Sequence, residues 1–361
     1  MEGDSFSMNV KGKFFGRVFL FLFFSTMVPF GVFAISCWDI ITEDTNLTED
    51  LLNCRYYGLE IGAGNITLDC QGHTISGSFD NAGIIVPNHE FDGVKIRNCV
   101  LQNFKYGMTF SGNFGEISNN IFQNNRYNGL NYFGNDSVIS GNIFRNHPVN
   151  NGIGGFGLKL GPPIIGKIRR NVISGNIMEN NYHGVSLEDD VLDNRFMDNV
   201  VANNSISGFR IQRQVINNIF SGNVVKNNRI GFNFLGDKIN GNQFFSNYIT
   251  GNRTAGIQVD SGSDVSNMIY NNYFHNPVNV IDPYAANVWN IEKTEGTNII
   301  GGPYTAGNYW SDYNGLDLDG DGIGDTDTPH DSNGNIRTGG DYLPLVFHMG
   351  VPQLATPRRW P

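Results

Sequence analysis

A phrase of the form Asn-apolar-apolar-x-Asn recurs roughly every 24 residues through the middle of the chain. Several of these phrases lead into a glycine followed by alternating apolar and polar residues, as in Gly184-Val185-Ser186-Leu187. An alternation with period two is typical of a short strand that buries one face. Repetition at this length predicts a solenoid, in which each coil covers the apolar face of its neighbour. The phrases begin at Asn98, Asn120, Asn142, Asn176, Asn199, Asn223, Asn247 and Asn272.

The repeats divide the chain of 361 residues into segments. Residues 61–300 carry the phrase and predict about ten coils. Residues 37–60 lack it and are expected to form an N-terminal cap, while residues 301–347 form a C-terminal extension rich in Asp and Gly. Residues 348–361 are expected to be a flexible tail. The long step from Asn142 to Asn176 contains Pro148, Pro162 and Pro163, so its extra residues should leave the strands as a loop.

Stacking of the coils in register would place equivalent side chains in files along the axis. One file is Ile121, Ile143, Ile177, Val200, Val224, Tyr248 and Tyr273, and the next is Phe122, Phe144, Met178, Val201, Val225, Ile249 and Phe274. At least one of the two must face the core. A third file is expected to pair its amides from coil to coil and to satisfy the backbone of the turns. Its members are Asn124, Asn146, Asn180, Asn203, Asn227 and Asn276, interrupted by Gly251.

The first 36 residues have the features of an export signal. Basic residues precede an uncharged apolar run from Val18 to Ile35, and Val32-Phe33-Ala34 resembles a cleavage site. Cleavage after Ala34 or Ser36 would release a secreted or cell-surface protein. Two alternatives remain open: an uncleaved membrane anchor, since about 18 apolar residues can just span a bilayer, and a lipid attached at Cys37. The anchor would be the only membrane contact that we expect.

The four cysteines lie in the first hundred residues, and an even number in an exported chain favours disulfides. Cys70 and Cys99 end similar strands. If these strands lie in successive coils, the backbones are about 4.8 Å apart, which is within the range of a disulfide. We therefore expect Cys70–Cys99, with Cys37–Cys54 linking the cap. The alternative is a stack of free thiols in the core.

Composition narrows the choice of partners and metals. The formal charge is −10, and no run of Lys and Arg of the kind needed to bind phosphates is visible in the sequence. Nucleic acid is therefore excluded as an expected partner. The seven histidines are scattered without a short-spaced pair, so the sequence indicates neither a zinc nor a copper site.

An acidic loop in the extension predicts a calcium site. Carboxylates occupy the first, third and fifth positions, Gly322 the sixth, and a backbone carbonyl is available at the seventh. The twelfth position is Thr328 rather than Glu, so a last ligand would have to come from Asp327, Asp331 or Asp341. We expect a structural Ca²⁺, and the alternative is a solvated acidic turn. The expected ligands are Asp317, Asp319, Asp321, Ile323 and Asp325.

A second candidate site follows from the polar position of each glycine-led strand. That position forms an outward file: Thr109, Asn131, Lys159, Ser186, Arg210, Asn233 and Gln258. Charged residues lie beside it on two coils. Such a face suits an extended polysaccharide, and an acid–base pair could lie there. The alternative is a solvated surface of ion pairs. The candidate residues are Lys159, Glu188, Asp189, Asp190, Arg210 and Arg213.

Several motifs resemble right-handed parallel β-helix proteins with pectate-lyase-like coils, particularly the NosD-type repeat family common in archaeal surface proteins. They are the run from Asn65 to Gly77, the asparagine phrases, and the stretch from Gly307 to Tyr313 with the loop and Asp341-Tyr342-Leu343-Pro344-Leu345 that follow it. The resemblance covers residues 37–347. It implies an all-β, right-handed, single-stranded parallel β-helix, a fold that hosts lyases, hydrolases, epimerases, adhesins and surface-layer proteins.

The resemblance also implies two kinds of chemistry. Polysaccharide lyases of this fold use calcium held by acidic coil residues and an arginine base, roles that Asp189, Asp190 and Arg210 or Arg213 would take here. The NosD prototype is linked to copper handling. We therefore carry three hypotheses: a secreted non-catalytic protein that binds carbohydrate or builds the cell envelope, a polysaccharide lyase or glycoside hydrolase, and a copper-delivery protein. A cleft over residues 159–213 would favour the enzyme, whereas a flat polar flank would favour binding.

Overall fold

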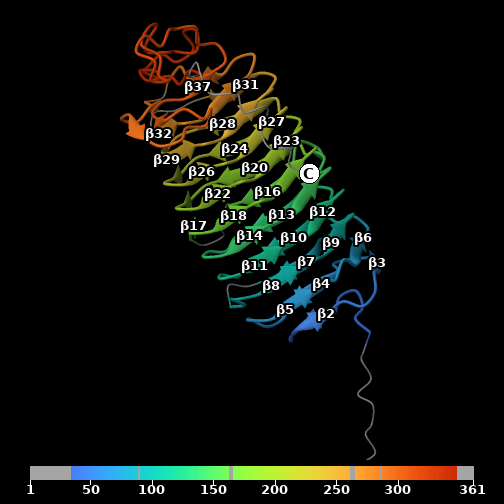
Figure 1. The fold of residues 1–361 in the computed structure, drawn as a ribbon. Helices are drawn as coiled ribbons and strands as arrows, with labels where there is room; N and C mark the ends of the chain where they lie inside the picture. The colour runs from blue at the N-terminus through green and yellow to red at the C-terminus, as the bar shows by residue number, and fades with distance from the viewer. Residues whose placement is uncertain (1–33, 88–89, 162–165, 261–264, 285, 348–361) are drawn as a thin grey trace, which may run out of the picture. The chain divides into compact units, whose positions relative to one another are not determined.

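The computed structural model describes residues 34–87, 90–161, 166–260, 265–284 and 286–347. Within these ranges the compact unit that starts at Ile35 consists of strands and turns, and it contains no helix (Figure 1). Accordingly, no helix in the described part of the chain is long and apolar enough to cross a membrane. The expected signal peptide or anchor lies almost entirely outside the described residues, and the expected tail lies wholly outside them.

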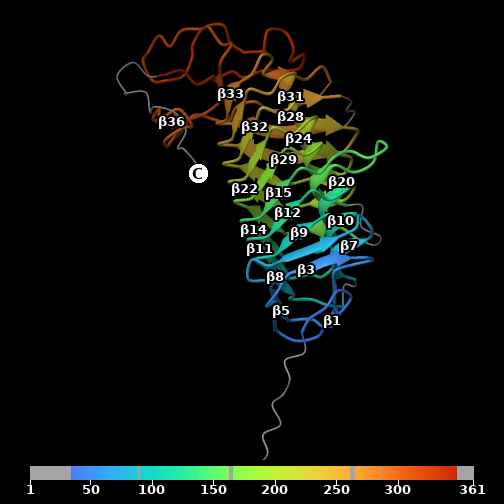
Figure 2. The same cartoon turned by 90° about the vertical axis from the view of Figure 1, so that its right-hand side faces the viewer.

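Three parallel sheets, here called A, B and C, stack their strands along the solenoid (Figures 1 and 2). Sheet A consists of β1 (Ile40–Ile41), β4 (Leu59–Ile61), β7 (Ala82–Val86), β10 (Tyr106–Phe110), β13 (Asn128–Tyr132), β16 (Phe156–Leu160), β20 (His183–Glu188), β24 (Ser207–Gln212), β28 (Ile230–Leu235), β31 (Ala255–Val259) and β34 (Val280–Ile281). Sheet C consists of β3 (Leu51–Cys54), β6 (Thr74–Gly77), β9 (Val100–Gln102), β12 (Ile121–Gln123), β15 (Ile143–Arg145), β19 (Ile177–Glu179), β23 (Val200–Ala202), β27 (Val224–Lys226), β30 (Tyr248–Thr250), β33 (Tyr273–His275) and β37 (Tyr309–Trp310).

Sheet B bends where its later coils carry two short strands instead of one. Its main series is β2 (Thr45–Asn46), β5 (Thr67–Asp69), β8 (Lys95–Arg97), β11 (Glu116–Ser118), β14 (Val138–Ser140), β18 (Val172–Ser174), β22 (Arg195–Met197), β26 (Ile219–Ser221), β29 (Ile239–Phe245) and β32 (Val265–Tyr270). A second series, β17 (Ile168–Arg169), β21 (Val191–Leu192) and β25 (Val215–Ile216), joins it at β29. A separate antiparallel pair, β35 (Thr294–Glu295) and β36 (Tyr304–Thr305), lies in the C-terminal region.

The observed register confirms the all-β, right-handed parallel β-helix. Sheet A contains eleven strands, in agreement with the expected ten or so coils. Phe122 is paired in register with Phe144, and Phe144 with Met178. This second apolar file is fully buried, so it is the one that faces the core. Like rings also stack from coil to coil elsewhere in the core; the centroids of Phe220 and Phe244, for example, are 4.5 Å apart.

The glycine at the second position of most strands of sheet A allows neighbouring coils to approach closely. A Cβ placed on Gly184 would lie 2.7 Å from the carbonyl oxygen of Gly208 and 2.4 Å from a methyl carbon of Val201. Both distances are shorter than a carbon atom can tolerate. The glycine in the repeated phrase is therefore required for the packing of one coil on the next.

Buried asparagines form three hydrogen-bonded ladders along the solenoid. In most steps the Asn side chain donates through Nδ2 to Oδ1 of the asparagine in the next coil, as Asn199 does to Asn223 at 3.0 Å, and the same oxygen also accepts a backbone N–H. In the second ladder Asn181 reaches Asn204 through its backbone N–H, and the last step, Asn276 to Asn279, lies within one coil. The first ladder, between sheets B and C, is Asn120, Asn142, Asn176, Asn199, Asn223, Asn247, Asn272 and Asn308. The second, between sheets C and A, includes Asn181, Asn204, Asn228, Asn252, Asn276 and Asn279. The third, at the bend of sheet B, is Asn171, Asn194, Asn218, Asn242, Asn267 and Asn287.

Two ladder positions predicted from the sequence are wrong by one residue. The file that begins at Asn124 does not form the second ladder until its last member. Asn124 has a φ of 53°, and it is the following residue, Asn125, that is buried. Asn98 likewise has a left-handed backbone (φ 56°), and Cys99 occupies the position at which the first ladder begins. Asparagine suits both positions because it tolerates φ > 0 and can also replace backbone partners.

Each ladder ends at a carboxylate contributed by residues 282–341. Asp341 accepts the backbone N–H of Asn308 at 2.7 Å, in the place where another asparagine oxygen would stand. The last amide of the second ladder donates to Asp312 (2.7 Å), and the last amide of the third donates to Asp282 (2.8 Å). These contacts supply hydrogen-bond partners to the last coil at three points around the cross-section of the solenoid.

The helix extends beyond the boundaries expected for residues 61–300. Residues 37–60 already contribute β1, β2 and β3, which pair in parallel with the next coil, so this segment forms a first coil and is not a separate cap. At the other end β37 continues sheet C on β33. Both expected disulfides are present, Cys37–Cys54 and Cys70–Cys99. The Cα atoms of the second are 4.7 Å apart, close to the spacing of one strand.

Candidate functional site

The outer face of sheet A brings three of the expected charged residues together. Lys159, Ser186 and Arg210 are paired in register on β16, β20 and β24. Glu188 follows Ser186 by two residues and therefore projects from the same face. Its Oε2 lies 2.9 Å from Nζ of Lys159, and its Oε1 lies 2.5 Å from Nη1 of Arg210. The three side chains form one cluster, here called the central cluster, that spans three coils.

The central cluster keeps Glu188 ionised. Burial acts to raise the pKa of its carboxyl group, but the hydrogen bond and charge of Lys159 together with the charge of Arg210 outweigh that effect and leave the pKa below its usual value. Ser186 adds a donated hydrogen bond of 3.0 Å. A carboxylate held in this way is a poor general acid, because a general acid needs a raised pKa to retain its proton near neutrality.

The remaining expected residues lie in the adjoining turn, between sheets A and B. Asp189 and Asp190 both have left-handed backbone conformations, as do Arg213 and Gln214 one coil later. Arg213 forms an exposed ion pair with Asp189 at 3.0 Å. The side-chain amide of Gln214 lies 3.0 Å from the Asp190 carboxylate. Within the described residues, Asp189 and Asp190 do not belong to any group of three side chains close enough to hold a metal ion.

Aromatic side chains beside the central cluster were not anticipated from the sequence. Phe156 stacks on His183 with ring centroids 5.4 Å apart, and Tyr182 meets the edge of the same histidine at 4.9 Å. Nζ of Lys159 lies 5.5 Å from the centre of the Phe156 ring. Burial, followed by the charge of Arg210, lowers the pKa of His183 to about 3, so its imidazole is neutral at neutral pH. The sequence contained a signal for this stacking, because Phe156 and His183 both precede the glycine of their strands and so occupy equivalent positions in successive coils.

The long step from Asn142 to Asn176 adds residues on both sides of β16, which belongs to this face. One inserted loop, residues 146–155, precedes β16, and a second insertion, which contains Pro162 and Pro163, follows it; residues 162–165 lie outside the described part of the chain. A recess of about 450 Å³ is found elsewhere, at the corner of sheets B and C, where Asp69, Gln71 and Asn98 contribute to its walls. That recess is remote from the residues expected to carry chemistry.

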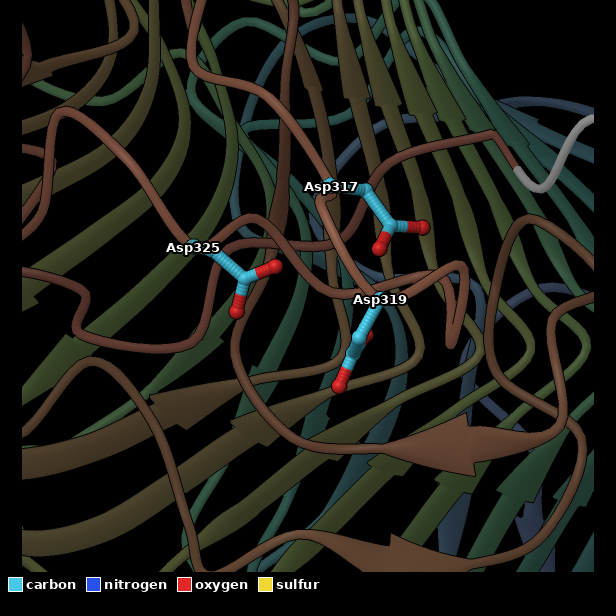
Figure 3. A group of neighbouring side chains, drawn as sticks. All are labelled: Asp317, Asp319 and Asp325. Carbon is cyan, nitrogen blue, oxygen red and sulfur yellow. The ribbon is translucent and has the colours of Figure 1, made fainter.

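The acidic loop gathers only part of the expected calcium ligands. Carboxylate oxygens of Asp317, Asp319 and Asp325 all lie within 4.8 Å of one another (Figure 3). Asp321 instead forms an ion pair with Lys293. Ile323 is buried against Leu345, and its N–H donates to Asp321. The structure therefore brings together the first, third and ninth positions of the loop rather than the first, third and fifth.

The geometry of this loop fits a hard cation in part. The backbone N–H groups of Gly320, Asp321 and Gly322 donate to the Asp317 carboxylate, and they outweigh burial in lowering its pKa. Three ionised carboxylates can supply up to six oxygens, which is within the coordination range of Ca²⁺. Asp341, considered above as a completing ligand, is fully buried at the end of the first ladder, so it is not available to this loop.

Comparison with known proteins gives a family match over one part of the chain and a similar fold over most of it. The model of the NosD family, described as "Periplasmic copper-binding protein (NosD)", matches residues 164–315. These coils are similar to those of the NosD family. The match covers less than half of the chain. No curated protein matches the sequence.

Solved structures with similar coordinates are parallel β-helices of low sequence identity. The Dettilon tailspike protein gp208 has a TM-score of 0.55 at 15% identity, with 70% of this chain and 56% of the tailspike covered. An alginate lyase from Paenibacillus sp. str. FPU-7 has a TM-score of 0.50 at 13% identity, with 70% and 97% covered. Pectate lyase Pel9A reaches 0.46 at 16%, with 70% and 72% covered. The chain thus spans little more than half of the tailspike, and at these identities the likeness shows the fold alone.

The described residues of the matched region contain no group of three His, Cys, Asp or Glu side chains close enough to share a metal ion. Copper favours imidazole, thiolate and thioether ligands. All four cysteines are in disulfides. Among the described residues, the only group of three His, Cys, Asp or Glu side chains close enough to share a metal is Asp317, Asp319 and Asp325. His89 and His348 lie outside the described ranges. The one such group, three carboxylates, offers the oxygen ligands of a hard cation rather than those that copper favours.

Proposed function

We propose that this protein binds an extended polysaccharide along the outer face of sheet A and does not cleave it. The observation that carries the proposal is the central cluster, in which Lys159, Glu188 and Arg210 lie beside the Phe156 and His183 rings on consecutive coils. Sugars are bound by side chains that combine hydrogen-bonding groups with aromatic surfaces. A solenoid face repeats such groups along a line and so suits a linear polymer.

The state of Glu188 favours binding over hydrolysis or elimination. A glycoside hydrolase needs two carboxyl groups on opposite sides of the scissile bond, one of them with a raised pKa. The pKa of Glu188 is lowered, and Asp189 and Asp190 lie in the neighbouring turn in contact with Arg213 and Gln214. Arg210 is engaged by Glu188 through an ion pair, so its guanidinium is directed to that carboxylate.

The test is a glycan array run with and without calcium, together with an absorbance assay for unsaturated sugar products. We expect binding without product. Arg210→Gln should weaken binding by about tenfold or more, because it leaves Glu188 with one cation in place of two. The matched control is Arg195→Gln, an exposed cation on sheet B. Formation of unsaturated or hydrolysed products would establish the enzyme instead, and a complete lack of glycan binding would refute the proposal.

We also propose that a Ca²⁺ ion at Asp317, Asp319 and Asp325 stabilises the C-terminal region. The closeness of three carboxylates supports this proposal, since their mutual repulsion falls when a cation lies between them. The proposed role is structural, because the loop lies outside the repeated coils and far along the chain from the central cluster.

We further propose a secreted or cell-surface location, with polysaccharide of the cell envelope or surroundings as the partner. Two disulfides are typical of proteins that fold in an oxidising compartment outside the cytoplasm. The family matched by residues 164–315 is described as periplasmic. Labelling of intact cells with a membrane-impermeant reagent would distinguish a surface protein from one retained inside.

A further inference from the structure

The corner that leads from sheet C into sheet A has an unusual distribution of charge. Seven consecutive turns precede the strands from β10 to β31, and they comprise residues 103–105, 124–127, 146–155, 180–182, 203–206, 227–229 and 251–254. These turns contain four cations and no Asp or Glu. The cations are Lys105, Arg126, Arg229 and Arg253, here called the basic edge. Figure 2 shows this corner between β9, β12 and β15 on one side and β10 and β20 on the other.

The described cations of the basic edge are not neutralised by a neighbouring carboxylate. Within the described residues none of the four forms an ion pair, whereas Lys159, Arg210 and Arg213 all do. Arg126, Arg229 and Arg253 are exposed. In a chain with a formal charge of −10, a line of uncompensated positive charge is a local exception.

The opposite corner of sheet A, which leads into sheet B, is acidic. Its described turns contain five aspartates against three cations, and one of the aspartates, Asp136, is paired with Arg170. The aspartates are Asp136, Asp189, Asp190, Asp237 and Asp260, and the cations are Lys167, Arg213 and Lys238. Its arginine, Arg213, is paired with Asp189. The two edges of one sheet therefore carry opposite charge. An anionic chain lying on this sheet would be drawn toward one edge and repelled from the other.

Aromatic rings accompany the cations at one end of the basic edge. Nζ of Lys105 lies 5.3 Å from the ring centre of Tyr106 and 5.7 Å from that of Tyr127. The guanidinium carbon of Arg126 is also 5.7 Å from the Tyr127 ring. The rings of Tyr106 and Tyr127 are 5.9 Å apart. Hydrophobic ring surface and positive charge are thus available at the same place.

The basic edge has a gap over its three middle turns, and there the cations lie instead on the face of sheet A, where Lys159 and Arg210 are paired with Glu188. Lys105, Arg126, Lys159, Arg210, Arg229 and Arg253 belong to six of the seven consecutive coils that contribute β10 to β31 to sheet A. Coils are spaced at about 4.8 Å. A polymer extended along the axis would therefore meet two cations of the basic edge at each end of this span and the ion-paired central cluster between them. Such a distribution suits a chain that carries several negative charges along its length.

We infer that the polysaccharide bound by this face is anionic, bearing carboxylate or sulfate groups, and that it lies along the basic edge with those groups against it. This inference rests on the binding function proposed above and adds the class of ligand. The rings of Tyr106, Tyr127 and Phe156 contact the sugar faces, while the cations contact the acidic substituents. The acidic edge fixes the side of sheet A on which the chain lies.

The test compares anionic polymers with neutral counterparts of the same backbone: polygalacturonate with its fully methyl-esterified form, and dextran sulfate with dextran. Affinities are measured by isothermal titration calorimetry on the full chain. We expect the anionic member of at least one pair to bind more tightly, with an affinity that falls as salt is added. Equal binding of both members of each pair would overturn the inference and leave the proposed function standing, whereas no binding of any glycan would remove both.

A matched pair of double variants locates the site. Arg126→Gln with Arg253→Gln removes two charges from the basic edge, and Arg169→Gln with Arg195→Gln removes two exposed charges from sheet B. Exposed ion pairs change affinity by roughly twofold to fivefold each, so the first variant should lose about fourfold to twentyfold. The second should bind as the parent does. Equal losses in the two variants would mean that the attraction is non-specific and would overturn the inference. Unchanged melting temperatures verify that both variants are folded.

Discussion

Two disulfides hold the first coils of this solenoid, Cys37–Cys54 and Cys70–Cys99, whereas three carboxylates, on Asp282, Asp312 and Asp341, receive the amides at its other end. The ends of a solenoid are its weak points, because the outermost strands have a neighbour on one side only. One end is secured covalently and the other by hydrogen bonds to ionisable groups. The first should be insensitive to pH, and the second should depend on it.

The covalent end should give the largest effect. Replacement of Cys70 and Cys99 by alanine removes a link across 29 residues and should lower the free energy of unfolding by about 3 kcal/mol. Urea unfolding followed by circular dichroism measures the loss. The same change at Cys37 and Cys54, a separation of 17 residues, should cost less because it frees a shorter loop. An equal stability of the reduced and oxidised proteins would show that the disulfides are dispensable.

The polar end should be nearly as sensitive to loss of Asp341. Asp341→Ala leaves the N–H of Asn308, the Nε1–H of Trp310 and the N–H of Leu343 without their acceptor in a buried place. We expect a loss of about 2–4 kcal/mol in the free energy of unfolding. Hydrogen exchange should increase first in the last coils. Glu49→Ala, at an exposed position in the first coil, is the control and should leave the unfolding midpoint unchanged.

The pH dependence of the polar end has a defined sign. Burial raises the pKa of Asp341 to about 6, against an ordinary value of 3.8, even though N–H donors oppose the shift. The folded protein therefore binds this proton more tightly than the unfolded chain does. Its contribution is present below pH 4 and is lost as the pH rises to about 6. The difference is on the order of 3 kcal/mol. Asp341→Asn should flatten this part of the stability profile, and an unchanged profile would contradict the assignment.

Removal of calcium should produce a smaller change at the same end. If Ca²⁺ occupies the site formed by Asp317, Asp319 and Asp325, a chelator should lower the melting temperature by a few degrees, corresponding to about 1–2 kcal/mol. Asp319→Asn should reduce both the stability and its response to calcium. The disulfide-linked coils should keep their hydrogen-exchange protection throughout. A melting curve that is identical with and without chelator would count against a structural ion.

Asp312 should show the smallest effect, with a sign opposite to that of Asp341. Burial acts to raise its pKa, but the hydrogen bond and charge of His330 and the amide of Asn279 outweigh it and lower the pKa. Its contribution to stability is therefore present above pH 4 and is lost as the pH falls through the lowered pKa. Asp312→Asn should remove that loss in acid. A variant that still loses the same stability in acid would exclude Asp312 as its source.

The periodic part of the molecule could be predicted from the sequence, because every coil presents the same pattern. The outward file of Lys159, Ser186 and Arg210 and the pairing of Cys70 with Cys99 both follow from alignment of the repeats. The one-residue error at Asn124 has a physical cause. The phrase contains adjacent asparagines, one for a left-handed turn and one for the ladder, and both uses favour the same residue type.

The parts that could not be predicted depend on contacts outside the repeat. The carboxylates of Asp312 and Asp341 meet the ladders only after a non-periodic segment has folded back onto the last coil. The basic edge was missed for a different reason. Lys105 and Arg253 are 148 positions apart in the chain and come together only as equivalent turns of a stack. A search for runs of Lys and Arg is unable to detect a line that uses at most one residue per coil.

The ladders also bear on how such a molecule can change in length. Every interior asparagine of the first ladder, for example Asn176, Asn199 and Asn223, makes the same two bonds to the next coil. Excision of residues 199–222, one complete turn, would bring Asn176 into line with Asn223 without creating an orphaned amide. Duplication or deletion of a whole turn should therefore leave the hydrogen bonds of the first ladder intact. The span of polymer that the outer face can engage would grow or shrink with each turn, while both closures stayed as they are.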